Sequence, residues 1–144
     1  MDKQAEMGWC VRPCRLEEAE ALLELWKQAQ ATPSVTDTPA DLRRVLAAGT
    51  AHVLVAEAGG QVAGSIIGTF DGWRGHIYRL AVHPDFRRRG IARVLVRAVE
   101  ERLIAAGARR LIPLVEKDHA WATAFWQSMG YAPDPRIVRY LRNV

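Results

Sequence analysis

The stretch HIYRLAVHPDFRRRGIA, residues 76–92, joins a strand-like segment to the start of a helix and decides the fold. Its first half is rich in β-branched and aromatic residues, and an apolar helical repeat begins after Gly90. Between them come Pro84 and three consecutive arginines, residues 87–89. A strand-loop-helix turn with glycine at its tightest point leaves unpaired N–H groups beside the positive end of the helix dipole. The sequence therefore predicts an anion site at the mouth of this helix.

Upstream of this stretch, the pattern predicts a strand, two helices and a hairpin. The first strand, WCVRPC, stops near Pro13, and apolar residues at helical spacing follow it. Thr38 before Pro39 indicates the cap of a second helix, and Gly59-Gly60 is a strong hairpin signal between two β-rich runs. The predicted elements are a strand at 9–14, helices at 16–26 and 38–49, and antiparallel strands at 51–58, 61–70 and 76–82.

Downstream, apolar residues at three-to-four spacing predict a helix from Gly90 to near Gly107. Segment 109–115 has the character of a buried strand, and a right-handed crossover would set it parallel to strand 76–82. The remaining elements are a last helix at 119–131 and an extended tail at 136–143 that could pair as an edge strand. The fold class is therefore α+β, a mixed, mostly antiparallel sheet flanked by helices on both faces.

The size and composition of the chain favour one soluble domain over residues 1–144. Hydrophobic residues are 49% of the chain, but no apolar run approaches the roughly 20 residues of a membrane helix, so we expect no membrane partner. The N-terminus lacks the apolar stretch of a signal peptide. We interpret the only two cysteines, Cys10 and Cys14, as reduced cytoplasmic thiols. No second Cys or His pair stands at ligand spacing, so we expect no metal site.

The net charge of +4 and a pI near 9.5 favour an anionic partner. Charge alone leaves nucleic acid, a membrane surface and a phosphorylated small molecule open. The chain has neither a P-loop sequence nor a Gly-x-Gly-x-x-Gly run after a strand, which excludes the usual nucleotide sites. Its arginines cluster at one helix start without a base-stacking pattern or a DNA-binding motif, so we expect no nucleic-acid partner.

Residues 71–92, DGWRGHIYRLAVHPDFRRRGIA, resemble the GNAT superfamily of acyl-CoA N-acyltransferases, in particular its small bacterial YpeA-like members. The spacing Arg87-x-x-Gly90-x-Ala92 is similar to the pyrophosphate loop of that superfamily, and the resemblance extends from VRPCRLEEAEALLELW to FWQSMGYAP. It implies a GNAT-like fold and an N-acetyltransferase with acetyl-CoA as cosubstrate. The implied coenzyme A contacts are Leu80, Ala81 and Val82 for the pantetheine arm, and Arg87, Arg88, Arg89, Gly90, Ile91 and Ala92 for the pyrophosphate.

The resemblance further implies that the Val82 N–H faces the thioester carbonyl. Members often carry an asparagine before the last helix and, inside it, a tyrosine that protonates the departing thiolate; here His119 and Trp126 stand at those positions. Trp126 cannot donate such a proton, and it either packs beside Phe125 and Met129 or flanks the pantetheine. The pKa of the departing thiol is comparable with the ~8.5 of cysteine, so water or His119 could return its proton.

An amine must be neutral to attack a thioester, so a residue that acts as a general base could take the proton from the acceptor amine. His76 falls where histone-type members of the superfamily place a basic glutamate, and its alternative is a solvent-facing residue at a strand end. Strand alternation predicts that His76, Tyr78 and Leu80 share one face, too far from the thioester for direct contact, so the base would act through water. Glu116, at the end of the fifth strand, is the other catalytic candidate, with a surface carboxylate as its alternative.

The acceptor is expected to be a primary amine on a small molecule or a protein. In the superfamily, the first helix, loop 32–39 and the turn at Trp73 build its pocket. Asp37, Asp41 and Asp71 in these segments could attract a cationic amine or could be solvated loop carboxylates. The alternative function is a non-catalytic acyl-CoA sensor or interaction module, which the missing tyrosine leaves open. A homodimer is also left open.

Overall fold

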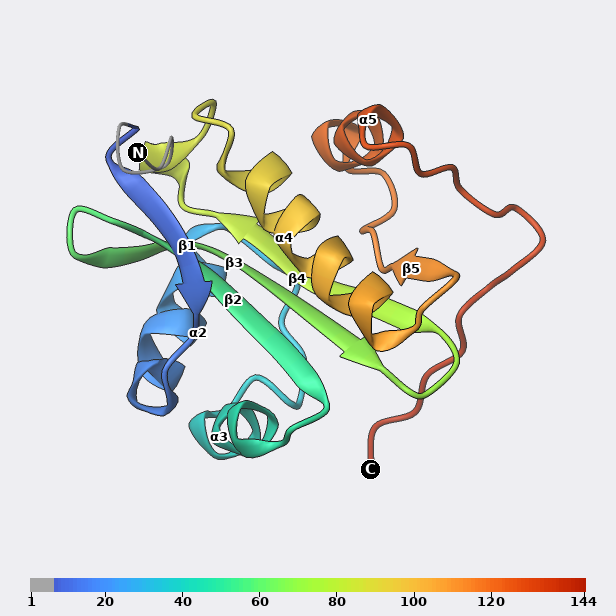
Figure 1. The fold of residues 1–144 in the computed structure, drawn as a ribbon, viewed down its shortest axis with the longest axis horizontal. Helices are drawn as coiled ribbons and strands as arrows, with labels where there is room; N and C mark the ends of the chain where they lie inside the picture. Colours follow the sequence, from blue (N-terminus) through green and yellow to red (C-terminus); the bar gives the residue numbers. More distant parts are fainter. Residues whose placement is uncertain (1–6) are drawn as a thin grey trace. The chain divides into compact units, whose positions relative to one another are not determined.

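A five-stranded sheet with the order β1-β2-β3-β4-β5 is the frame of the chain up to Leu114 in the computed structural model, which describes residues 7–144 (Figure 1). Neighbouring strands are antiparallel except for β4 and β5, which are parallel. This confirms the predicted mixed, mostly antiparallel sheet, with the fifth strand parallel to the fourth. The strands are β1 (Trp9–Pro13), β2 (Ala51–Ala58), β3 (Gln61–Phe70), β4 (Gly75–Val82) and β5 (Leu111–Pro113).

The described chain divides into two compact units, of which the first ends at Leu114 and the second comprises Val115–Val144. The single domain over 1–144 stays a prediction. The absence of a signal peptide was expected largely from residues 1–6, which lie outside the described residues. Within residues 7–144, no helix combines the length and the apolar character needed to cross a bilayer.

Local sequence signals explain the hairpin between β2 and β3. Gly59 and Gly60 have φ values of 57° and 76°, which are accessible to glycine without steric cost. Two successive positive φ angles are typical of the type I′ turn, whose twist matches that of antiparallel strands. The register then pairs Ala58 with Gln61 directly beside the turn.

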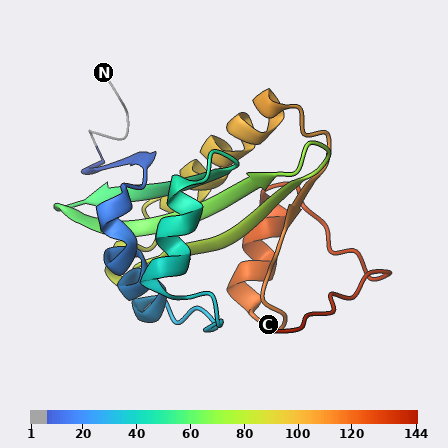
Figure 2. The same ribbon diagram turned by 90° about the horizontal axis from the view of Figure 1, so that it is seen from below.

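Helices cover both faces of the sheet, as predicted (Figure 2). On one face lie α2 (Ala19–Gln28), which follows a short 3₁₀ helix, and α3 (Pro39–Ala47). The other face is covered by α4 (Ile91–Ala106). The predicted cap of α3 is confirmed, because the Thr38 side chain accepts a hydrogen bond from the Asp41 N–H at 3.1 Å. This arrangement places the start of α4 beside the end of β4.

Each face of the sheet has its own apolar core. Toward α2 and α3, the buried residues include Leu22, Leu25 and Trp26 from α2 and Val53 and Val55 from β2. Toward α4, Leu95, Val99 and Leu103 are fully buried. Burial of each such side chain contributes about 1.5–3 kcal/mol, so α4 is held firmly against the strands.

A bulge interrupts β4 at Arg79. Ile67 and Ser65 of β3 are two residues apart, whereas their partners on β4, Tyr78 and Ala81, are three apart. Because the bulge adds one residue to β4, the alternation of side chains shifts beyond it. Tyr78 and Ala81 both pack in the core toward α2. The predicted shared face of residues 76, 78 and 80 is therefore wrong beyond Tyr78, and residue 81 takes the place of residue 80.

The second unit contains one helix, α5 (Ala120–Ser128), as predicted. Gly130 follows it with a φ of 94°. The predicted edge strand at 136–143 is wrong, because no strand is assigned there. Successive side chains such as Ile137 and Val138 are both exposed, so neither face of this segment is buried to favour a sheet.

Candidate functional site

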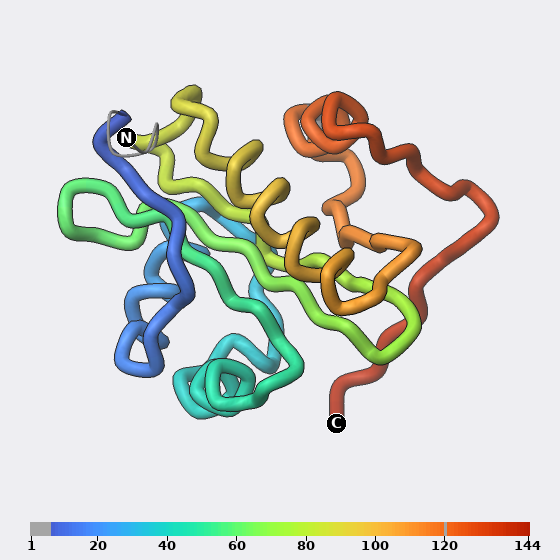
Figure 3. Tube along the Cα trace, viewed as in Figure 1, coloured from blue at the N-terminus to red at the C-terminus, as the bar shows by residue number. Residues whose placement is uncertain are grey.

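The anion site predicted from the sequence corresponds to the turn between β4 and α4, residues 83–90, which we call the α4 turn and which Figure 3 traces. A short 3₁₀ helix (Pro84–Phe86) follows β4, and Gly90 precedes α4 with a φ of 83°. Arg88 also has a left-handed backbone, with a φ of 63°. No side chain in the described part of the chain caps this end of α4. The N–H groups of its first turn are therefore available to an anionic ligand.

The three arginines of this turn are all exposed. The Arg87 Nε atom donates to the Val82 carbonyl over 3.4 Å, and the Arg89 guanidinium lies 5.0 Å from the centre of the Phe86 ring. Among residues 7–144, none of Arg87, Arg88 and Arg89 forms an ion pair. Their positive charge adds to that of the helix dipole, so the turn favours a phosphate-like ligand.

The outer edge of β4 is open just before this turn. β5 pairs with β4 only at residues 75–77, and the Leu114 N–H adds one bond, 2.9 Å long, to the Ile77 carbonyl. Pro113 has no N–H with which to continue the ladder. Beyond Ile77, no strand of the described chain pairs with this edge. An extended ligand that carries amides could add to residues 78–82 as a further strand does.

The open edge and the anion site are consecutive in the chain. Leu80 is half-buried, and Ala81 and Val82 are each only 7% exposed. A ligand at this edge therefore meets backbone rather than side chains. The geometry suits a long ligand with amides at one end and a phosphate group at the other, lying along β4 toward Gly90.

The first catalytic candidate, His76, lies farther back on the same strand. Its half-buried ring stacks on Tyr78, with ring centroids 6.3 Å apart. The register places His76 between Thr69 of β3 and Ile112 of β5. His76 and Tyr78 thus share a face as predicted. A water-relayed role of His76 as general base stays a prediction.

The acidic residues expected near the acceptor have structural partners. Asp37 was expected to attract an amine or to be solvated, but its carboxylate accepts two hydrogen bonds from Arg79, at 2.8 and 2.9 Å. The Asp37 side chain is only 17% exposed. The interpretation of Asp37 as a solvated carboxylate is therefore wrong, and its attraction for a cationic amine stays a prediction.

The other two acidic residues are also bound locally. Asp41 accepts a hydrogen bond from the Thr38 hydroxyl and pairs with Arg44 on its own helix. Asp71 accepts the N–H groups of Arg74 and Trp73 within its turn, and these bonds lower its pKa. Both carboxylates therefore have a structural role in capping and turn formation.

The second unit holds the remaining predicted residues. Glu116 was expected at the end of the fifth strand, but β5 ends at Pro113 and Glu116 is an exposed residue beyond it. His119 caps α5, because its Nδ1 atom accepts the Ala122 N–H at 3.3 Å. That bond leaves the ring proton of a neutral His119 on Nε2. The positions of both residues relative to the α4 turn stay predictions.

Trp126 packs among aromatic rings, as its simpler interpretation predicted. It is 7% exposed, and its ring meets those of Phe125 and Tyr131 edge-on, with centroids 5.6 and 5.2 Å away. The contact with Tyr131 was not predicted. Its only signal in the sequence is the five-residue spacing across the end of the helix, which also lets the Tyr131 N–H bond to the Trp126 carbonyl.

Residues 7–144 contain no group of three or more His, Cys, Asp or Glu placed to hold a metal ion. Cys10 and Cys14 are both free thiols in the structure. Burial raises the pKa of the Cys14 thiol to about 11, which makes it a poor nucleophile near neutral pH.

Two comparisons of sequence agree with this geometry. The profile of the acetyltransferase (GNAT) family matches residues 19–131. A protein of Pectobacterium atrosepticum named Acetyltransferase ECA0875 is 36% identical over 121 residues, which are 84% of this chain and 86% of that protein.

Solved structures share the fold. An aminoglycoside N-acetyltransferase, AAC(6')-Iy in complex with CoA, has a TM-score of 0.76 and 20% identity, and the match covers 94% of this chain and 95% of that one. The PaiA N-acetyltransferase of Thermoplasma acidophilum in complex with coenzyme A has a TM-score of 0.75 and 15% identity, over 84% and 87% of the two chains. At these identities the likeness concerns the fold.

Proposed function

The chain belongs to the acetyltransferase (GNAT) family, and from this premise we propose that acetyl-CoA binds along β4 with its pyrophosphate at the start of α4. The protein is an N-acetyltransferase with acetyl-CoA as cosubstrate. The observation that supports this placement is the edge of β4, which is open beyond Ile77 in the described chain and leads to a helix start without a side-chain cap there. The three arginines beside it form no ion pair within residues 7–144. The backbone N–H groups from Arg88 to Ala92 would bind the pyrophosphate, and the arginine side chains would neutralise it from outside.

The pantetheine arm would pair with the backbone of Leu80, Ala81 and Val82. Its amides have the donors and acceptors that a missing strand would supply at this edge. The thioester would then lie near the Val82 N–H. A fixed N–H donor in this place stabilises the oxyanion that forms when an amine attacks the thioester carbon.

The reaction is a direct attack by the neutral amine on the thioester. A lysine-like amine of pKa ~10.4 costs roughly 4 kcal/mol to deprotonate at pH 7, and an α-amine of pKa ~7.7–8.0 costs on the order of 1 kcal/mol. A base is therefore most useful for a lysine-like acceptor. His76, acting through water, is the first candidate base, and Glu116 is the second. The proton on His119 Nε2, or water, would neutralise the departing thiolate.

The acceptor is a primary amine. The structural relatives include enzymes named as aminoglycoside acetyltransferases, whose acceptors are amines on small molecules, and a ribosomal-protein-alanine N-acetyltransferase from Brucella melitensis biovar Abortus 2308. Small-molecule amines and protein amines are therefore both within the range of this fold. The acidic residues that flank the expected acceptor loop are internally paired, so they offer little net charge to select a cation.

The test is acetyl transfer by the purified full chain to three acceptors: an α-amine, a lysine-like amine and an aminoglycoside. Release of free thiol is followed with time, and the acetylated amine is identified by mass. We expect thiol release that depends on the amine and matches the product formed. Tight binding of acetyl-CoA with no transfer to any amine would instead support the non-catalytic sensor.

A further inference from the structure

Arg79 occupies a backbone conformation that arginine does not favour. It lies at the bulge in β4 with a φ of 54°, in the left-handed region where glycine, asparagine and aspartate are preferred. A residue with a Cβ atom and a long side chain is disfavoured in this region. The interactions of the side chain must therefore compensate for the strain of the backbone.

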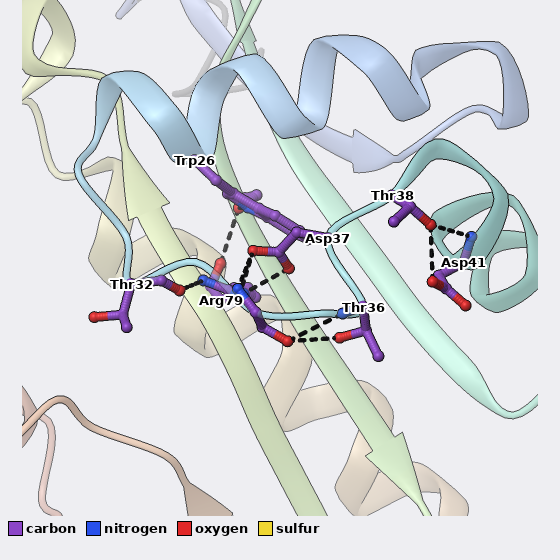
Figure 4. A network of polar contacts seen from close by, with 9 residues as sticks. Trp26, Thr32, Thr36, Asp37, Thr38, Asp41 and Arg79 are labelled. Atoms are coloured by element: carbon purple, nitrogen blue, oxygen red, sulfur yellow. Dashed lines mark hydrogen bonds and ion pairs between the residues drawn. The ribbon is translucent and has the colours of Figure 1, made fainter. Parts of the chain in front are cut away.

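The guanidinium of Arg79 is held from three directions (Figure 4). One terminal nitrogen donates to both Asp37 carboxylate oxygens, and the other donates to the Thr32 carbonyl at 3.0 Å. The guanidinium also lies over the Trp26 ring, 4.8 Å from its centre. The Arg79 and Asp37 side chains are 20% and 17% exposed, so water screens their ion pair only partly.

The backbone of Arg79 is held as well. The buried Ser65 hydroxyl donates to the Arg79 carbonyl at 2.8 Å and accepts the Trp26 indole N–H at 2.9 Å. Trp26 therefore contacts the Arg79 guanidinium with its ring and reaches the Arg79 carbonyl through Ser65. We call Trp26, Asp37, Ser65 and Arg79 the bulge clamp. It joins α2 and the loop after it to one residue of β4.

The bulge decides how the next three residues present their backbone. One extra residue reverses the faces of the side chains beyond it and, with them, the backbone N–H groups that point to each edge. The residues concerned are Leu80, Ala81 and Val82, the proposed pantetheine contacts. Because its residue Arg79 directly precedes Leu80, the bulge clamp is in position to set the orientation of the backbone of residues 80–82.

We propose that Arg79 is a positioning residue, which holds the bulge through Asp37 so that residues 80–82 present their backbone to the pantetheine arm. This inference rests on the proposed function. It assigns no part in the chemical step to Arg79 and no part in binding the pyrophosphate, whose contacts lie in the α4 turn. Loss of the clamp should therefore weaken only ligands that carry pantetheine.

The test compares two ligands on each variant by calorimetry. Coenzyme A carries the pantetheine arm, whereas adenosine 3′-phosphate 5′-diphosphate keeps the pyrophosphate and lacks that arm. Arg79→Met should weaken coenzyme A by about tenfold, the size of a coupled contact, and leave the affinity of the second ligand unchanged. Asp37→Asn should have the same selective effect, and the double variant should lose no more than Arg79→Met alone, because the two residues act through one ion pair.

Two further variants separate positioning from stability. Arg79→Gly removes the side chain, but glycine suits the left-handed backbone. The variant should therefore fold, and it should bind coenzyme A more weakly than wild type does. Arg136→Met is the matched control, because Arg136 forms a similar double hydrogen bond to Asp134 at the surface, at 3.0 and 3.1 Å. It should leave both affinities unchanged. Thermal unfolding of every variant shows whether it is folded.

The outcomes distinguish this inference from the proposed function. If wild type binds neither ligand, the proposed function is wrong, and this inference falls with it. If wild type binds both while folded Arg79→Gly and Asp37→Asn bind coenzyme A as wild type does, only the role of Arg79 is wrong. Equal weakening of both ligands would show a general structural effect and would also overturn the positioning role.

Discussion

Ile91, the first residue of α4, packs directly on Gly64 of β3: a Cβ atom added to Gly64 would lie 2.9 Å from the Ile91 Cγ2 atom. Gly64 is also the register partner of Val82 at the end of β4. Gly64 therefore lies against both parts of the proposed coenzyme A site, the end of β4 and the start of α4. The close approach of α4 to the sheet depends on that missing side chain.

Gly64→Ala should destabilise the fold by about 1–3 kcal/mol, because the added methyl group overpacks the contact with Ile91. It should also weaken acetyl-CoA binding, since the start of α4 has to shift. Gly49→Ala is the matched control: its φ is not positive and no atom lies within 4 Å of an added Cβ. Denaturant unfolding and calorimetry measure both effects. Equal stability and affinity for Gly64→Ala and wild type would contradict the close contact.

Trp126→Tyr should leave acetyl-CoA affinity similar to wild type and turnover equal or modestly higher. The reason is that an indole N–H is far too weak an acid to protonate a thiolate, whereas a phenol is acidic enough. Trp126→Phe is the control for lost volume, because it differs from the tyrosine variant only by the hydroxyl. Turnover of the two variants is compared at saturating acetyl-CoA. A large loss in a well-folded Trp126→Tyr would reveal an active role of the indole.

His76→Ala should lower kcat/KM by up to about 10²-fold for a lysine-like acceptor and by less for an α-amine. The difference follows from the greater cost of deprotonating the more basic amine. The measurement is the pH profile of kcat/KM with each acceptor, in which the acidic limb should change. His52→Ala, a half-buried histidine on β2, should keep the wild-type profile. An unchanged rate and acidic limb in His76→Ala would leave Glu116 or bulk water as the base.

The ion pair between Arg12 and Glu18, which is largely shielded from water, makes the free energy of unfolding depend on pH. Arg12 donates two hydrogen bonds to the Glu18 carboxylate, at 2.7 and 2.8 Å, and the two side chains are 17% and 15% exposed. These bonds hold the pKa of Glu18 below its ordinary value. Because the folded pKa is the lower one, the contribution is complete above the ordinary pKa of ~4.3 and is lost as pH falls through the folded value.

Glu18→Gln should therefore reduce the free energy of unfolding by about 1–3 kcal/mol at pH 7, as expected for hydrogen bonds to a charged group. The difference from wild type should shrink as pH falls below ~4.3. Glu20→Gln is the control, since Glu20 pairs with Arg43 at the exposed surface and should show a small difference at any pH. Denaturant unfolding across the pH range measures both. A constant deficit of Glu18→Gln down to acid pH would contradict the pKa assignment.

The sheet and helices could be predicted because their signals are local. Gly59-Gly60 specifies its turn through the φ angles that glycine allows, and the helix from Ile91 shows its apolar face directly in the spacing of its residues. The α4 turn was predictable for the same reason, since Gly90 and the arginines lie within a few residues. The ends of strands were harder to predict: the strand predicted at 109–115 is shorter in the structure, where β5 comprises Leu111–Pro113.

The bulge in β4 could not be predicted from the strand itself. Residues 76–82 alternate without an obvious insertion, and the interaction that holds Arg79 comes from Asp37, 42 residues earlier in the chain. An arginine within an apolar strand was the only signal. The catalytic candidates are harder still, because His76 lies in the first unit and His119 in the second, and no local pattern in the sequence links them.

The most direct test of the account is the affinity of acetyl-CoA for wild type, Gly90→Glu and Gly72→Glu, measured by calorimetry. Both glycines have positive φ angles, 83° and 93°, and open space beside them, so the two variants carry the same strain and charge at different places. We predict that Gly90→Glu abolishes binding by setting a carboxylate against the pyrophosphate, while Gly72→Glu binds as wild type does. Folded Gly90→Glu that binds acetyl-CoA as tightly as wild type would contradict the placement of coenzyme A at the start of α4.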